Sequence, residues 1–457
     1  MAQASFPLLL LPRPTRLLPI LLLTSAASLS ACGGVSSTGT GGSSSSSATT
    51  TTGAGGAIPQ ARVIVRDYAG HPAIGVDVLV HDLDGATIQQ TKTDKTGAAN
   101  VDLVDGGGIT ALWRTDGDSK VAEYNAVSVV GLTRGAEIRL VADPVAPYPH
   151  VDMTLAFTGV APLQSSAWNI VVSCDEEAMS GEQTLHFFPA CHSDSYDLIA
   201  FLAPGDKRIV FPTQPVQAGM NVPFVLDLAK AEPAPALVVN FTGIPGATSW
   251  LGAGLTANRP EGGRTRFDIG KPLTSSQDVQ LQISRLFVSP GGTFDLDLDT
   301  QTAAGGVRSR RYFQANDLPT SPIPWQIPTL TAVGKIGTLA GSMIRPEVPW
   351  ALALGGTPTD AVRIQLEYQA TDAPPPALGG THTTRWALYQ ASTPTGTAKF
   401  PEIPPFFLGF TPETATLRVV ADQVDVPGKD SLLAAVNADF DRVDVSFASS
   451  VSFFPPL

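Results

Sequence analysis

The chain has 457 residues, too many for one ordinary domain, and it contains 43 Gly and 39 Pro with only 15% charged residues. This composition disfavours long amphipathic helices and favours short strands joined by Gly/Pro turns. Acidic residues outnumber basic ones, 41 against 29, which argues against a nucleic-acid partner and against attachment to an anionic lipid surface by charge.

Residues 1–31 have the layout of a secretory signal peptide. Arg13 and Arg16 precede a compact apolar run at residues 17–23, and small residues follow it. The apolar run is too short to span a bilayer as a helix. We therefore predict that residues 1–31 direct export and are then removed.

The end of this leader, Leu29-Ser30-Ala31-Cys32, resembles the lipobox of bacterial lipoproteins. The resemblance implies that Cys32 becomes the new N-terminus and carries acyl chains, palmitate among them, which anchor the protein in a membrane. Two acyl chains already give stable attachment. The resemblance also implies a cell-envelope location, and Gly33 after the cysteine fits sorting to the outer membrane. The alternative is an ordinary cleaved signal followed by a chance cysteine.

Residues 32–57 are predicted to form a flexible linker. Of the 25 residues at 33–57, 21 are Gly, Ser or Thr. Such a sequence has little to bury and behaves as a disordered coil. Its root-mean-square length is about 25–30 Å, enough to hold a folded part clear of a membrane surface.

Alternating apolar and polar residues begin in the range 58–145, where Val76, Val78 and Val80 share one face of a strand. Turn residues such as Gly70-His71-Pro72 and Asp84-Gly85 separate the expected strands. This pattern predicts a β-sandwich.

The runs Gly70-His71-Pro72, Gly75-Val76-Asp77-Val78 and Thr93-Asp94-Lys95-Thr96-Gly97 resemble the carboxypeptidase regulatory-like group of bacterial Ig-like domains. The resemblance implies a seven-stranded Greek-key sandwich that serves as a spacer or binding module without catalysis. We expect His71 and His81 to be solvated turn and strand residues rather than metal ligands.

Three later stretches resemble one another, running from Phe157 to Trp168, from Phe241 to Trp250 and from Leu339 to Trp350. We interpret them as marks of three further β units, at 148–233, 234–328 and 329–457. Chance similarity in a Gly/Pro-rich sequence is the alternative. The predicted fold is therefore all-β, with tandem Ig-like sandwiches after a signal peptide and a disordered tether. The cleanest amphipathic strand, residues 362–368, is expected to have one face in water.

Cys174 and Cys191 are the two thiols that remain once Cys32 is acylated. Outside the cytoplasm a disulfide between them is the expected state, and it would stabilise the fold by about 3 kcal/mol on the chain-entropy model. The alternative is a zinc site that adds His186 and His192. Adjacent strand residues point to opposite faces, so Cys191 and His192 do not suit one metal. We therefore predict no metal site.

Several polar motifs have two interpretations each. Asp295, Asp297 and Asp299 alternate along one strand and could recruit calcium, but such a row is more often the water face of a strand. The acidic runs 82–85 and 116–118 are interpreted first as turns. Arg308-Ser309-Arg310-Arg311 follows two glycines and is expected to be an exposed loop. The tryptophans could form glycan-stacking platforms, although buried cores are the simpler explanation; they are Trp113, Trp168, Trp250, Trp325, Trp350 and Trp386.

The sequence contains no G-x-S-x-G elbow, no H-E-x-x-H motif and no phosphate-binding glycine loop, so no catalytic residue and no cofactor is predicted. We expect a lipid-anchored envelope protein that is not an enzyme and acts as a binding, adhesion or structural module. Its partners would be the membrane, through the lipid, and an unknown protein or glycan. The alternative is an exported hydrolase with the Ig-like unit as an accessory, because paired carboxylates meet only in the fold.

Overall fold

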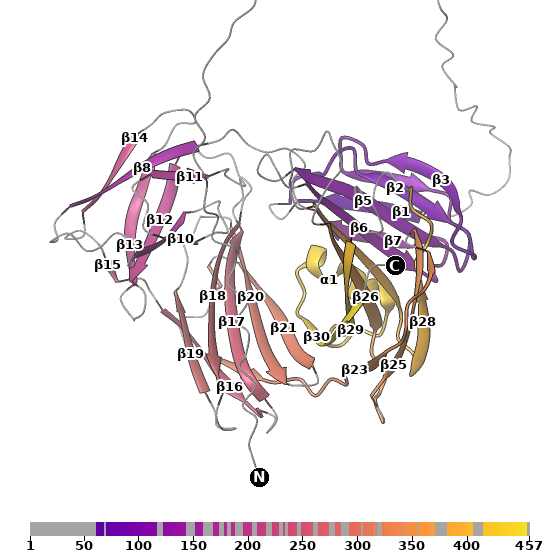
Figure 1. Cartoon of the computed structure of the whole chain (residues 1–457). Coiled ribbons are helices and arrows are strands. Elements are labelled where there is room, and N and C mark those ends of the chain that lie inside the picture. The colour runs from indigo at the N-terminus through magenta and orange to yellow at the C-terminus, as the bar shows by residue number, and fades with distance from the viewer. Residues whose placement is uncertain are drawn as a thin grey trace, which may run out of the picture. The chain divides into compact units, whose positions relative to one another are not determined.

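The computed structural model of the chain is almost entirely β, as predicted, and its strands are arranged in tandem sandwiches (Figure 1). The structure describes residues 61–67, 70–116, 122–142, 151–158, 168–172, 178–180, 184–187, 195–202, 208–215, 222–227, 232–233, 236–244, 248–258, 264–273, 279–284, 292–302, 305–314, 316–317, 322–342, 344–353, 355–370, 382–404 and 415–454.

The first sandwich has a three-stranded sheet in the order β4-β1-β7 and a second layer in the order β6-β5-β2-β3. Every second residue of β1 is buried, including Val63 and Val65, and these side chains pack against Val78, Val80 and Ile109 of the other layer. The alternation in the sequence therefore produces the two-layer core. The strands are β1 (Ala61–Arg66), β2 (Asp77–His81), β3 (Thr87–Lys92), β4 (Ala98–Val101), β5 (Gly108–Asp116), β6 (Ala122–Val130) and β7 (Glu137–Val141).

The second sandwich repeats this arrangement. Its sheets have the orders β11-β8-β14 and β10-β9-β12-β13-β15. When the strands are numbered from one within each sandwich, both sandwiches contain the orders 4-1-7 and 3-2-5-6, and the second adds β15 beside its sixth strand. In both, the first strand is antiparallel to the fourth and parallel to the seventh. The strands are β8 (Val151–Thr158), β9 (Trp168–Val172), β10 (Ala178–Ser180), β11 (Thr184–Phe187), β12 (Ser195–Leu202), β13 (Arg208–Pro215), β14 (Val222–Asp227) and β15 (Glu232–Pro233).

The third sandwich has the same topology again, with sheets β19-β16-β22 and β18-β17-β20-β21. Its core joins Leu237, Val239 and Phe241 to Leu296 and Leu298 of the facing layer. The strands are β16 (Ala236–Thr242), β17 (Thr248–Asn258), β18 (Arg264–Pro272), β19 (Val279–Ser284), β20 (Thr293–Thr302), β21 (Gly305–Gln314) and β22 (Ile323–Gln326).

The fourth sandwich keeps the layer β27-β26-β29-β30, which matches 3-2-5-6, and pairs β28 with β25, which matches 4-1. Instead of a seventh strand, β23 and β24 cover the other side of β25. The strands are β23 (Val333–Ile336), β24 (Ala340–Ser342), β25 (Arg345–Leu352), β26 (Ala361–Ala370), β27 (His382–Ala391), β28 (Thr395–Lys399), β29 (Ala415–Asp425) and β30 (Val445–Phe454), with the helix α1 (Leu432–Asp441) between the last two.

Layers of three sandwiches join into one twelve-stranded sheet, in the order β18-β17-β20-β21-β30-β29-β26-β27-β6-β5-β2-β3. The fourth sandwich is in the middle, since β27 pairs with β6 and β30 pairs with β21. Each junction pairs two strands that would otherwise be sheet edges with unused hydrogen-bonding groups. The predicted domain boundaries stay a prediction, but strand pairing crosses between the predicted units.

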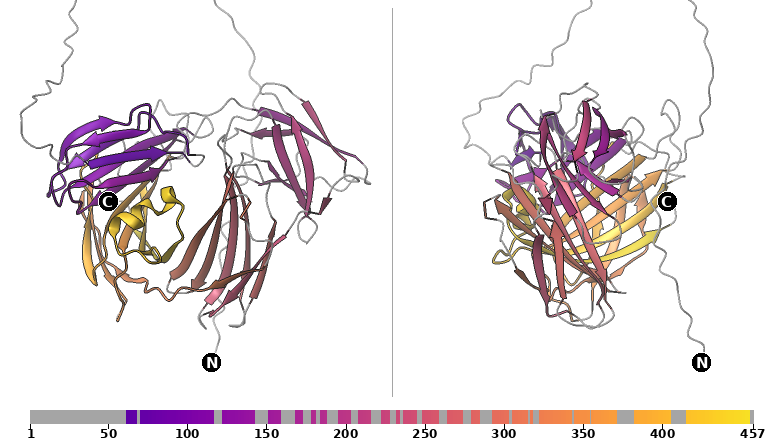
Figure 2. Two further views of the ribbon diagram at one scale, coloured as in Figure 1. Left: turned by 180° about the vertical axis from the view of Figure 1, so that it is seen from behind. Right: turned by 90° about the vertical axis from the view of Figure 1, so that its left-hand side faces the viewer.

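The helix α1, the yellow coil in the left view of Figure 2, begins after Ser431, whose side chain accepts a hydrogen bond from the Ala434 amide. It ends at Arg442, which adopts the left-handed conformation with φ 53°. The helix packs its Ala435 and Ala438 on Val424 and Phe447 of the twelve-stranded sheet. It therefore covers part of one sheet face.

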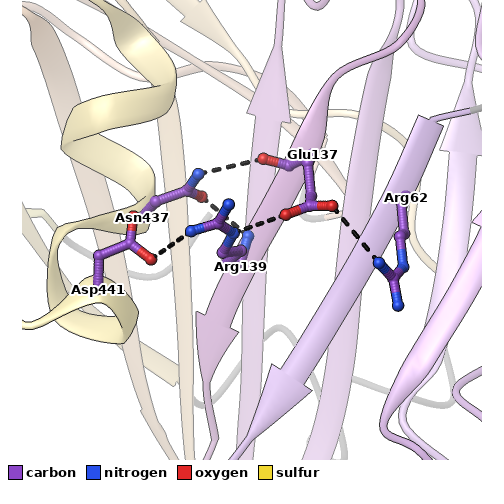
Figure 3. A network of polar contacts seen from close by, with 5 residues as sticks. All are labelled: Arg62, Glu137, Arg139, Asn437 and Asp441. Carbon is purple, nitrogen blue, oxygen red and sulfur yellow. Dashed lines mark hydrogen bonds and ion pairs between the residues drawn. The ribbon is translucent and has the colours of Figure 1, made fainter.

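The same helix also holds β7, the edge strand of the first sandwich (Figure 3). The Asn437 side chain accepts a hydrogen bond from the Arg139 amide at 2.8 Å and donates one to the Glu137 carbonyl at 3.1 Å. The Arg139 guanidinium in turn reaches Asp441 at 2.6 Å and Glu137 at 2.7 Å. One amide side chain thus satisfies an exposed strand edge as a neighbouring strand would.

Candidate ligand-binding groove

The residues assigned to lipidation and to the disulfide, Cys32, Cys174 and Cys191, lie outside the described residues, and both assignments stay predictions. Of the alternative zinc set, His186 lies on β11, while His192 is also outside the described part. Within the residues that the structure describes, no group of three or more His, Cys, Asp or Glu side chains could hold a metal ion.

Two polar motifs that the sequence separated are partners in the structure. The acidic row on β20 and the basic run on β21 form neighbouring strands, with Asp297 opposite Arg310 and Asp299 opposite Arg308. The prediction of an exposed loop for 308–311 is wrong, because these residues continue a strand. The prediction of a water face for the acidic row is also wrong, since Asp295 and Asp297 are buried.

These side chains belong to what we call the polar face of the twelve-stranded sheet, which carries Asp297, Arg310, Arg363 and Asp422. On the other face of the same strands, Leu298, Ile364 and other apolar side chains enter the sandwich cores. The amphipathic strand predicted at 362–368 lies within β26 and divides in this way. Its polar side is partly buried instead of fully in water, because Glu367 is only 8% exposed.

Under the helix, the charges of the polar face are paired by the protein. Arg310 donates to Asp297 at 2.7 Å and to Asp439 of α1 at 3.1 Å, and Tyr312 also donates to Asp439. Burial opposes the charge on Arg310, but Asp439 and Asp297 outweigh it and hold its pKa well above the ordinary value. Burial would likewise raise the pKa of Asp439, but Arg310 and Tyr312 hold it below the ordinary value.

Beyond the helix, the polar face opens into a groove with a volume of about 570 Å³. This volume is within the range of about 300–1,000 Å³ that is usual for ligand sites. The floor is formed by β20, β21, β30, β29 and β26. Its charged lining consists of three arginines and two aspartates, Arg308, Arg363, Arg418, Asp299 and Asp422.

Two of the three arginines are held by carboxylates. Arg363 donates to Asp422 at 2.7 Å, and Arg418 donates to Glu367 at 2.7 Å. Asp422 also accepts a hydrogen bond from the Ser449 hydroxyl. Burial disfavours the charge on Arg363, yet Asp422 raises the pKa of that arginine above its ordinary value.

Arg308 differs from both of them. Its guanidinium lies over the Phe447 ring, 4.8 Å from the ring centroid, and its buried Nε has no hydrogen-bond acceptor. Within the described residues it forms no ion pair, although Asp299 is its neighbour across the strands. Asp299 instead leans over Gly252 of β17, where even a Cβ atom would clash with its carboxylate. Burial and the nearby charge of Arg310 lower the pKa of Arg308.

Neutral groups that could contact a ligand also line the groove. Gln301 and Gln365 lie in its wall, and the side-chain amide of neither forms a hydrogen bond within the described part of the chain. Val451 also lines the groove and is 43% exposed. Trp250 lies opposite Gln301 across the strands, but its indole covers Gly270 of β18, away from β20. The site therefore combines cationic, amide and apolar groups.

The other aromatic and histidine predictions have mixed outcomes. Buried cores explain four tryptophans, as expected, namely Trp113, Trp325, Trp350 and Trp386. Trp168 lies on β9.

His71 is a turn residue bonded to Asp67, as predicted. His81 is not solvated, since it is fully buried and 2.8 Å from the Thr110 hydroxyl, and burial lowers its pKa to about 4. The turn predicted at 82–85 is confirmed by the hydrogen bond from the Asp84 amide to the Asp82 carboxylate.

Across the residues that the structure describes, the helix α1 is far too short to cross a bilayer, and no membrane-spanning helix is found.

Comparisons with known proteins give no family assignment. No family model matches the chain, and no curated protein matches it in sequence. Among solved structures, the Bacillus anthracis TIE protein is 9% identical, with 59% of this chain and 50% of that one covered and a TM-score of 0.18. The chain thus spans half the length of that structure.

Two further solved structures are similarly distant. The Streptococcal ancillary pilin is 11% identical over 54% of this chain and 91% of its own, with a TM-score of 0.15. The three N-terminal domains of the bacteriophage RB49 outer capsid protein Hoc are 8% identical over 83% and 97%, with a TM-score of 0.15. Likenesses at this level carry no argument about function.

Proposed function

We propose that this chain is a lipid-anchored cell-envelope protein whose tandem sandwiches present a ligand-binding groove, with no catalytic role. The observation that carries the proposal is the groove on the polar face, where Arg308 forms no ion pair with any residue that the structure describes. A buried cation without a counter-ion is costly, and proteins usually pair it. A site that binds an external ligand gives a physical reason for leaving it unpaired.

The anchor and the linker supply the location of this binding module. Acylated Cys32 would hold the chain at the envelope, and the Gly/Ser/Thr-rich residues 33–57 would let the sandwiches reach a ligand away from the membrane. The disulfide between Cys174 and Cys191 would brace the second sandwich in this exported setting. The net charge of −12 gives no reason to expect a nucleic-acid partner.

The proposal is tested by retention on isolated cell envelopes of a purified chain that begins at Gly33, so that neither the leader nor a lipid can hold it there. We expect this otherwise native chain to sediment with the envelopes and the same chain with Arg308→Gln and Gln365→Ala to stay in solution. Arg311→Gln is the matched control, because Arg311 is on the same strand but reaches the Pro324 carbonyl on the other side. Equal sedimentation of the double variant and the native chain would contradict the groove as the binding site.

The anchor has its own test. Growth with an alkyne-labelled palmitate should label the native chain, and Cys32→Ser should abolish the label. A labelled Cys32→Ser variant would contradict lipidation at this residue, while leaving the groove proposal in place.

A further inference from the structure

We infer that the groove binds an acidic saccharide, with a uronate-type carboxylate of the sugar as the ion-pair partner of Arg308. This inference rests on the proposed function and names the class of ligand. Its first support is the difference between two arginines of one strand. Arg310 has two carboxylates supplied by the protein, whereas Arg308, two residues away on the same face, has an aromatic ring and no ion pair among the described residues.

The arrangement around Arg308 prepares it for an anion. Phe447 lies beneath both Arg308 and Arg363, with guanidinium-to-centroid distances of 4.8 and 4.9 Å. This contact fixes the planar guanidinium without using its N–H groups. The fork of N–H donors on an arginine matches the two oxygens of a carboxylate. A ligand carboxylate would therefore complete a site that the protein has already ordered.

The rest of the lining suits a sugar. Gln301 and Gln365 have amide groups without hydrogen-bond partners among the described residues, and they can donate to and accept from sugar hydroxyls. Val451 in the groove lining is 43% exposed and offers apolar surface. Polar groups that fix orientation, beside apolar surface, are typical of small-ligand sites.

The strand pairing argues against a peptide as the ligand. Extended peptides bind β proteins mainly by adding a strand at a free sheet edge. The groove lies on a sheet face, and β21, β30 and β29 in its floor are each already paired on both sides. A peptide would find no unpaired backbone there, whereas a saccharide needs only side-chain contacts.

The test is calorimetric titration of the full chain with uronate tetramers, using galacturonate, glucuronate and mannuronate. Their methyl esters serve as uncharged counterparts of the same sugars, and hexaglutamate serves as an acidic peptide. We expect at least one uronate to bind, its ester to bind at least about ten-fold more weakly, and hexaglutamate not to bind. Arg308→Gln should weaken uronate binding by about ten- to one hundred-fold, and Arg311→Gln should leave it unchanged.

The contrary outcomes separate this inference from the proposed function. Equal binding of uronate and ester, both weakened by Gln365→Ala, would leave the groove a saccharide site and overturn the role of the carboxylate. Binding of hexaglutamate that depends on Arg308 would overturn the saccharide class alone. If no uronate binds, the inference is overturned. The groove's role as the binding site is a separate question, and it is overturned only if the double variant sediments with envelopes as the native groove does.

Discussion

The polar face of the twelve-stranded sheet has a covered part and an open part, and they use the same residue type differently. Under α1, Arg310 is enclosed by Asp297 and Asp439. In the groove, Arg308 lies on the same strand and face, yet among the described residues it contacts the Phe447 ring and forms no ion pair. The difference arises from the helix, which brings Asp439 to one arginine and leaves the other uncovered. Where the protein supplies two carboxylates, the charge of the arginine serves stability, and where the described residues supply no ion-pair partner, the charge is available to a ligand.

The largest expected effect is in the covered part. Asp297→Ala would leave the buried Arg310 without its closest carboxylate, and breaking a buried pair from one side costs about 3–5 kcal/mol of unfolding free energy. The loss should be visible as faster hydrogen exchange of the β20 and β21 amides. A loss below about 1 kcal/mol would mean that the covered charges are not a structural element.

A second effect depends on pH and arises in the first sandwich, away from Arg308 and Arg310, so it can be separated from the effects of both arginines. Burial lowers the pKa of His81 from 6.5 to about 4 in the folded chain. Between these values the unfolded chain binds a proton that the folded chain does not, so stability falls as the pH falls from 6.5 to 4. The full loss is about 3 kcal/mol.

Hydrogen exchange of the β2 and β5 amides at pH 7 and pH 5 measures this effect. His81→Gln keeps a hydrogen-bonding group near Thr110 without a titrating ring and should remove most of the pH dependence in the first sandwich. If the same pH dependence remained in His81→Gln, another group would be its source. Arg308→Gln should leave it unchanged.

A smaller effect concerns the helix that covers the polar face. Asn437→Ala removes two hydrogen bonds to the edge of β7, each worth about 1 kcal/mol, so the local stability of that edge should fall by about 2 kcal/mol. Exchange of the Arg139 amide, which donates to Asn437, measures it directly. Unchanged protection of this amide would show that the helix does not hold the edge.

The smallest effect on stability is expected in the groove. Arg308→Gln removes a half-buried charge that forms no ion pair among the described residues, so the free energy of unfolding should change by less than about 1 kcal/mol, and an increase would be in keeping with the lost desolvation cost. Thermal denaturation beside Asp297→Ala gives the contrast. A loss as large as that of Asp297→Ala would mean that Arg308 has a structural role after all.

The sequence predicted the β fold well, because strand alternation and turn residues are local signals. It was less informative about pairing. A short connection joins the acidic row of β20 to the basic run of β21. Asp297 and Arg310 lie equally far from this connection, as do Asp299 and Arg308, and this matching spacing was the signal of a hairpin that places acids opposite arginines. The two motifs were interpreted one at a time, so their partnership was missed, and with it the buried charges.

The repeat was also only partly visible. Trp168 begins β9 and Trp250 lies within β17, and each of these is the second strand of its sandwich. Trp350 lies on β25, which corresponds to the first strand of the other sandwiches. The apparent third copy is therefore shifted by one strand, and the sequence match there does not mark equivalent positions. The topology common to the sandwiches includes the first one, at β1–β7, which the tryptophan spacing did not reveal. Strand order is a long-range property that short motifs do not carry.

The groove could not be predicted because its charged groups come from four strands spread between Asp299 and Asp422, and their meeting depends on pairing between sandwiches. The most direct test of its role is a crystal structure of the full chain with the uronate tetramer that binds in calorimetry. We predict a sugar carboxylate within hydrogen-bonding distance of the Arg308 guanidinium, with Arg310 still held by Asp297 and Asp439. A saccharide bound elsewhere, with Arg308 still unpaired, would contradict the account.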